Sequence, residues 1–216
     1  MDLTFVGTLD HGTVLDAVDE IGPLVRAPEV AAAWSQESAL PGMTVGGLTR
    51  HLVSQPETAV DFLGIPVPAE APRPSLLAYA ASWDWLDAPV GHEANISIRD
   101  EFNAMGRAGA RDSVEALDSA AARLPAALAS AGPLTFVPWQ QVAIPTEDFL
   151  VVRLMEIVVH ADDLAVSVGL PTPRFADAAV EPVTRLLLAL ASRRHDQPAL
   201  VRALSRAERG GPISAF

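Results

Sequence analysis

The amino-acid sequence predicts an all-α protein, built as a helical bundle with additional helices at its C-terminus. Half of its 216 residues are apolar and only 19% are charged. Valine and isoleucine do not gather into the short alternating runs that are typical of strands, whereas the helix-forming residues alanine and leucine dominate. A chain of this length buries enough apolar surface to fold as a medium-sized domain without disulfides.

The helices are expected where apolar residues recur three or four positions apart between capping and turn residues. Gly22-Pro23 predicts a kink or a split in the first helix, and Pro56 predicts a bend in the second, because proline removes a helical hydrogen bond. Turn residues from Asp87 to Gly91 end the third. The expected helices cover residues 11–34, 44–62, 75–86, 93–130 as one or two helices, 149–168, 176–193 and 198–206.

One stretch has the composition of a strand, LTFVPW at 134–139. It is too short and isolated to predict a sheet, so we expect it to bridge two helices. The helix that follows, 149–168, is strongly apolar. Acidic residues before it complement the helix dipole, and Gly169 is placed to end it.

Charge and composition exclude several classes of function. The net charge of −12 and the pI near 4.7 argue against a nucleic-acid partner, which needs clustered basic residues. All 15 basic residues are arginine, so no lysine can form a Schiff base. There is no cysteine, so a bound metal must take nitrogen and oxygen ligands. The chain shows neither a signal peptide nor a run of about 18 apolar residues, so we expect a cytoplasmic protein without membrane contact.

A narrow polar stripe on the helix 149–168 is the most informative feature of the sequence. On a helical wheel, Arg153, Glu156, His160, Asp163 and Ser167 fall within an arc of about 80°. The stripe faces either solvent, as on many amphipathic helices, or other polar groups inside a bundle. Glu156 and His160 lie four residues apart, a spacing that lets both side chains converge on one ion.

A third ligand is needed, because a glutamate–histidine pair at this spacing often arises by chance. Metal sites in bundles are built from inward-facing side chains of neighbouring helices. His51 is the candidate, since Leu48, Gln55 and Phe62 fall within about 60° of it on the expected helix 44–62. From these residues alone, a core histidine without a metal is an equally open interpretation of His51.

Three segments, LPGMTVGGLTRHL, RLMEIVVHADDLAVSVG and RALSRAERGGPISAF, carry a resemblance that covers most of the chain. They are similar to the mycothiol-dependent maleylpyruvate isomerase family, within the DinB-like metal-binding superfamily of four-helix bundles. The resemblance implies a DinB-like four-helix bundle. We therefore expect a metal-binding helical bundle over residues 1–170 and a helical C-terminal extension, residues 171–216, packed on the same domain.

The resemblance also implies the ligands. Members of the family bind a divalent metal, usually zinc, through one histidine and a Glu-x-x-x-His pair, which match His51, Glu156 and His160. It implies zinc (Zn²⁺) as the cofactor and mycothiol, a sugar thiol, as the co-substrate. Three such ligands leave a coordination position open, as in catalytic zinc sites. Without cysteine, the nucleophile must arrive from outside, as a thiol or as metal-bound water.

Arg153 and Asp163 are the candidate catalytic residues beside the metal ligands. Arg153 could hold a substrate carboxylate or pair with Glu156, and a plain structural ion pair is the alternative. Asp163 could accept a hydrogen bond from a ligand imidazole, or act as a base. The family prototype carries a further C-terminal α/β domain that supplies an arginine, whereas residues 161–216 here predict helices.

Three classes of function stay open. The first is a zinc enzyme that uses mycothiol, as an S-transferase or as a thiol-assisted isomerase acting on an electrophilic small molecule. The second is a metal-dependent hydrolase or lyase that uses metal-bound water. The third is a metal-binding protein without catalysis, because a fold does not fix a function. Which C-terminal arginine, if any, reaches the site is open among Arg202, Arg206 and Arg209, and both a monomer and a homodimer remain possible.

Overall fold

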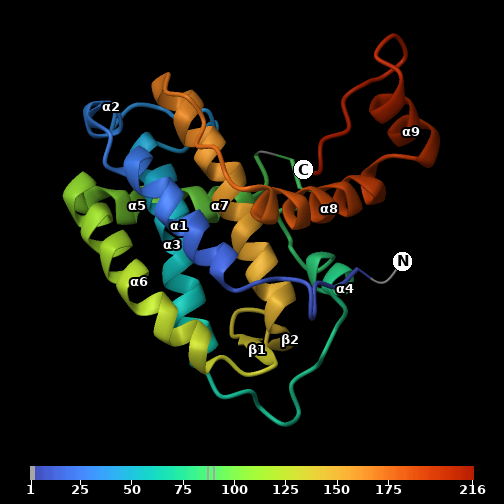
Figure 1. The fold of residues 1–216 in the computed structure, drawn as a ribbon. Coiled ribbons are helices and arrows are strands. Elements are labelled where there is room, and N and C mark those ends of the chain that lie inside the picture. Colours follow the sequence, from blue (N-terminus) through green and yellow to red (C-terminus); the bar gives the residue numbers. More distant parts are fainter. Residues whose placement is uncertain (1–2, 87, 90) are drawn as a thin grey trace.

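A computed structural model describes residues 3–86, 88–89 and 91–216, and its centre is a four-helix bundle. The bundle helices are α1 (Gly12–Val25), α3 (Val45–Leu63), α6 (Ala110–Ser130) and α7 (Thr146–Val168). Contacts from α1 to α6, α6 to α3, α3 to α7 and α7 back to α1 close the ring (Figure 1). The prediction of an all-α bundle is confirmed.

Further helices lie outside the four-helix bundle. They are α2 (Pro28–Ala32), α4 (Leu76–Ala80), α5 (Glu93–Met105), the short 3-10 helix η1 (Gly106–Ala108), α8 (Asp177–Arg194) and α9 (Gln197–Ser205). Helix α5 packs on α3, and α8 packs on α7 and α1, whereas α9 stands apart from the bundle (Figure 1). The domain boundary at residue 170 stays a prediction. Among the described residues, no helix combines the length and the hydropathy that a membrane span requires.

The core lies between α3 and α7, and it explains why these two helices are rigidly placed. Leu48 and Leu52 of α3, and Leu150 and Leu154 of α7, have no exposed surface. Each such side chain contributes about 1.5–3 kcal/mol through burial. At the start of α7, the buried carboxylate of Asp148 accepts a hydrogen bond from the backbone N–H of Phe5, at 2.6 Å, and thereby ties the N-terminal segment to the bundle.

The first expected helix is split, but not at the predicted place. Helix α1 continues through Gly22 and Pro23 and ends at Val25. The chain leaves the helical conformation at Ala27, whose ψ is 135°, directly before Pro28. Proline disfavours the helical conformation of the residue before it, and Pro28 then begins α2, where a missing N–H costs nothing.

Residues 134–139 do lie between two helices, as expected, but the expectation that they form no sheet is wrong. Residues Leu134–Val137 form β1, which pairs antiparallel with β2, Val142–Pro145. Gln141 takes a positive φ of 55° in the turn between them. The two strands form a hairpin that leads from α6 into α7 (Figure 1). Its second strand has no strand pattern of its own and is stabilised by the pairing.

The remaining helix predictions differ from the structure mainly at their ends. The expected helix 75–86 is shorter, because α4 ends at Ala80 and turns carry the chain to the buried Leu86. Asp87, the first residue of the predicted break, lies outside the described residues. The segment 93–130 forms two helices, separated at η1 and at Gly109, whose φ of 100° ends the helical path.

Candidate metal centre

The site lies where α3 and α7 cross, under the cover of α5. Helix α3 begins at Thr44, whose side chain accepts a hydrogen bond from the N–H of Gly47 at 2.9 Å. The link between α5 and α6 passes very close to this end of α3: a Cβ on Gly106 would meet the backbone of Gly46 at 2.9 Å. Only glycine allows this approach, which brings α5 against the side of α3 that carries His51.

Three side chains from these two helices converge in the interface. Glu156 Oε2 lies 3.4 Å from Nε2 of His51 and 3.0 Å from Nε2 of His160. One possible ligand atom from each residue lies within 4.8 Å of the other two. In the described part of the chain, this is the one group of three such residues that could hold a metal ion. The geometry joins the α7 pair to the α3 histidine that the sequence singled out.

Asp163 and Ser167 extend the polar stripe along α7 beyond the three converging residues. Asp163 Oδ2 lies 2.9 Å from Nδ1 of His160, so the carboxylate holds the imidazole ring from behind. A carboxylate in this position fixes the ring and leaves Nε2 for an ion. Ser167 accepts a hydrogen bond from the N–H of Ala39 at 2.8 Å and therefore anchors the loop before α3 rather than the site.

The protonation states of the three residues are coupled. Burial favours the neutral carboxyl, yet hydrogen bonds from His160 and His51 hold the pKa of Glu156 well below its ordinary value. Burial opposes a charged His160, yet its hydrogen bonds to Asp163 and Glu156 raise its pKa to about 9. Burial and the nearby charge of His160 lower the pKa of His51. At neutral pH these shifts favour a charged carboxyl group on Glu156, a neutral His51 and a protonated His160.

His51 is held by packing instead of by a second hydrogen bond. Its ring meets Phe102 of α5 edge to face, with centroids 4.3 Å apart, and lies 4.5 Å from the ring of His160. Its buried Nδ1 has no hydrogen-bond partner among the described residues. The side chain is nevertheless positioned, because α3 and α5 fix it from two sides. Phe102 was not singled out by the sequence, since only the packing of α5 on α3 reveals its role.

Arg153 lies in the same interface, one helical turn before Glu156 on α7. Its side chain donates to Oε1 of Gln55 at 2.7 Å, and its guanidinium lies over the ring of Phe149 at 5.6 Å. Arg153 is only 8% exposed, its Nε has no partner, and it meets no carboxylate within ion-pair distance in the part of the chain that the structure describes. Among the described residues, the contacts of Arg153 therefore give no support to a pairing with Glu156 or to another structural ion pair; Gln55 is its hydrogen-bond partner. Gln55 lies one turn after His51, a spacing that sequence alone noted without assigning a role.

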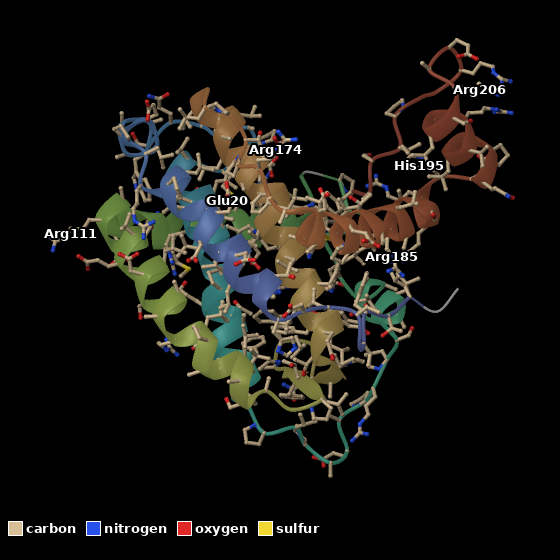
Figure 2. The ribbon with its side chains drawn as sticks, in the orientation of Figure 1. Glu20, Arg111, Arg174, Arg185, His195 and Arg206 are labelled. Carbon is tan, nitrogen blue, oxygen red and sulfur yellow. The ribbon has the colours of Figure 1, made fainter. Side chains whose placement is uncertain are left out.

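The C-terminal arginines do not reach this site within the same chain. Arg202 lies in α9, Arg206 directly follows it, and Figure 2 shows Arg206 at the far end of the segment that stands apart from the bundle. Both are exposed, as is Arg209. The idea that one of them supplies a cation to the site of its own chain has no support in this arrangement.

Comparison with known proteins agrees with this geometry. Residues 14–165 match the model of the mycothiol maleylpyruvate isomerase N-terminal domain, a stretch that contains His51, Glu156 and His160. Neither a curated protein nor a solved structure matches the chain. The match covers most of the chain and ends before α8. Because the match covers most of its residues, the chain belongs to the mycothiol maleylpyruvate isomerase N-terminal domain family.

Proposed function

We propose that this chain is a zinc-dependent cytoplasmic enzyme that uses mycothiol, as an S-transferase or as a thiol-assisted isomerase. The observation that carries the proposal is the convergence of His51, Glu156 and His160 within 4.8 Å of one another. The match to the mycothiol maleylpyruvate isomerase N-terminal domain supports the choice of thiol.

The residues present fit a zinc ion. Two imidazole nitrogens and one carboxylate oxygen are ligands that zinc accepts, and three protein ligands leave a fourth position open. Asp163 behind His160 is the kind of partner that metal-binding histidines have. Bound zinc would supply a positive charge that favours the thiolate form of a thiol. Because the chain has no cysteine, that thiol comes from a co-substrate.

Each nearby residue has a defined task in the proposal. His51, Glu156 and His160 hold the metal, and Asp163 keeps Nδ1 of His160 protonated so that Nε2 is free to bind. Asp163 is therefore a positioning residue. Its contact with His160 favours this task over that of a base acting on water, which the hydrolase or lyase alternative would require.

Arg153 would bind an anionic group of the electrophilic substrate. A buried guanidinium without a carboxylate partner is costly, and an ionic ligand removes that cost. The support is the 8% exposure of Arg153 and its unpartnered Nε. Gln55 and Phe149 hold the side chain from two sides, so that little freedom is lost when a ligand binds.

The two proposed reactions begin in the same way. The thiol loses its proton, and the sulfur forms a bond to an electrophilic carbon of the substrate. In an S-transfer, a leaving group then departs with the electron pair of its bond. In an isomerisation, formation of the carbon–sulfur bond breaks the π component of a carbon–carbon double bond, whose electron pair moves onto a conjugated carbonyl group of the substrate. After rotation about the resulting single bond, this electron pair re-forms the double bond, the carbon–sulfur bond breaks, and the released thiolate regains a proton.

A thiol-consumption assay tests the proposal. Zinc-loaded protein is mixed with mycothiol and an electrophile such as chlorodinitrobenzene, and Glu156→Gln is compared with Asp162→Asn, in which the changed side chain contacts Thr172 instead of the site. We expect turnover that needs both zinc and mycothiol and that Glu156→Gln abolishes. Turnover without a thiol would favour the hydrolase or lyase, and none across a broad panel of electrophiles would favour a protein without catalysis.

A further inference from the structure

Residues 196–211, here called the arm, leave the bundle and return to it. The arm contains α9 and the turn after it, and it extends away from the bundle helices (Figure 1). Both of its ends are held: Ser214 O lies 3.0 Å from Nε2 of His195, and the ring of Phe216 packs against Trp85 with centroids 5.5 Å apart. The arm is therefore a projecting hairpin with a fixed base.

Helix α9 is encoded in the sequence, yet the rest of the described chain covers it only in part. The side chain of Asp196 caps the helix by accepting a hydrogen bond from the N–H of Ala199 at 2.7 Å, and Pro198 lies in its first turn. None of the nine residues of α9 is buried. Isolated helices shorter than about 12–15 residues are marginal in water, so a helix of this length is stabilised by packing against another surface.

The side of α9 that faces α8 forms an apolar groove of about 330 Å³. Leu188 of α8 and Leu200, Val201 and Leu204 of α9 supply its apolar lining. Leu188 is 40% exposed, Val201 55% and Leu204 65%. Single exposed leucines are common on protein surfaces, whereas several exposed apolar side chains next to one another mark a contact surface.

Charge indicates what covers the arm. The arm contains three arginines and two carboxylates, and Arg193 and Arg194 at the end of α8 precede it, whereas the chain as a whole carries a net charge of −12. Arg206 marks the tip of the arm in Figure 2. The arm and the two arginines before it are together positive and the remainder of the chain is strongly negative, so a second copy of the same protein offers an acidic surface to the arm arginines.

We propose that the arm is a homodimerisation element. The apolar side of α9 in one copy packs into the α8–α9 groove of a second copy, and the arm arginines face the acidic bundle of that copy. Because each copy supplies both the apolar side of α9 and the groove that binds it, the two copies are related by a two-fold axis. Stable interfaces bury about 1,200–2,000 Å², more than one short helix supplies, so both arms engage at once.

Light scattering after size-exclusion chromatography, over a wide range of protein concentrations, tests this. We expect a dimer that dissociates on dilution. Leu204→Glu should be monomeric at concentrations where the unmodified protein is dimeric, because a carboxylate then enters the apolar contact. The matched control is Val6→Glu, at an apolar residue of 52% exposure outside the arm, which should remain dimeric. A monomer at all concentrations, or a dimer that Leu204→Glu leaves intact, overturns the proposal.

Thiol reactivity gives a second readout that does not depend on disrupting the contact. The chain has no cysteine, so Leu204→Cys places a single thiol on the arm. Its reaction with a bulky maleimide should slow several-fold as protein concentration rises, whereas Val6→Cys should react at a constant rate. Equal behaviour of the two thiols contradicts the burial of the arm in a dimer.

Discussion

The α3–α7 interface and the C-terminal arm both depart from the usual pattern of buried apolar and exposed charged side chains, but in different ways. The interface buries charge: Arg153 is 8% exposed and Glu156 is 9% exposed. The arm exposes apolar surface, with Val201 at 55% and Leu204 at 65%. Buried polar groups and exposed apolar patches are the informative exceptions in a folded protein.

The difference indicates what kind of partner each region lacks. Most of the buried charge is balanced internally, because Glu156 lies between His51 and His160, whereas the guanidinium of Arg153 has no ionic partner among the described residues. Such a site needs an ion or a small molecule. The arm has no internal balance, since no residue of α9 is buried. Its apolar side needs a surface as large as another protein.

The largest expected effect is the pH dependence of metal binding. His160 has a pKa raised from 6.5 to about 9, through Asp163 and Glu156, so the metal-free protein carries a proton there at neutral pH. A metal must displace this proton. Zinc affinity should therefore fall about tenfold for each pH unit below 9. Competition with a chromophoric chelator measures it, and an affinity independent of pH would show that His160 is not a ligand.

A smaller loss of metal affinity is expected when the support of His160 is removed. Asp163→Asn takes away the carboxylate that holds Nδ1 and should weaken zinc binding about 10–100-fold. Asp162→Asn is the matched control, because its carboxylate contacts Thr172 and should leave the affinity unchanged. Chelator competition compares the two variants, and equal affinities would rule out the positioning task of Asp163.

Removing the buried cation should have the opposite sign. Burial and the charge of His160 are the main causes of the lowered pKa of His51, and the charge of Arg153 adds to them, so Arg153 also disfavours a metal cation nearby. Arg153→Met should therefore tighten zinc binding by on the order of tenfold, while turnover of an anionic electrophile falls. Arg153→Lys keeps the charge and should retain the original affinity. Equal zinc affinities of Arg153→Met and Arg153→Lys would show that the charge of Arg153 does not influence metal binding.

The smallest expected effect belongs to the arm. Leu204→Ser should change the free energy of unfolding by less than about 0.5 kcal/mol in dilute protein, because Leu204 contributes little within one chain. Leu154→Ala, at a fully buried position of α7, should cost about 2–5 kcal/mol. Urea denaturation measures both. A large loss for Leu204→Ser in the dilute protein would mean that the arm packs on its own bundle.

Local patterns were enough to predict most of the fold. Helical periodicity and the caps at Thr44 and Gly169 are local signals, and the structure has helices there. The split in the first helix was predicted at Gly22-Pro23 but lies after Val25. The effect of Pro28 on the residue before it outweighed that of the Gly22-Pro23 pair. The hairpin was missed, since its second strand is visible only once it pairs with the first.

For the site as well, the residues with a local sequence signal were predicted and those placed by packing were not. Glu156 and His160 share one helix, so their spacing could be read directly, and His51 needed only the expectation that two helices meet. The contacts of Gln55 with Arg153 and of Phe102 with His51 depend on how α3 packs against α7 and α5. No local signal in the sequence encodes that packing, because it results from the burial of the whole core.

The central claim is that His51, Glu156 and His160 hold one metal ion. Elemental analysis of protein purified without a metal-affinity tag, repeated on His160→Ala, tests it most directly. We expect stoichiometric metal, chiefly zinc, in the unmodified protein and its loss in the variant. Circular dichroism shows whether the helices of His160→Ala are intact. Metal that stays stoichiometric in a folded His160→Ala variant would contradict the claim.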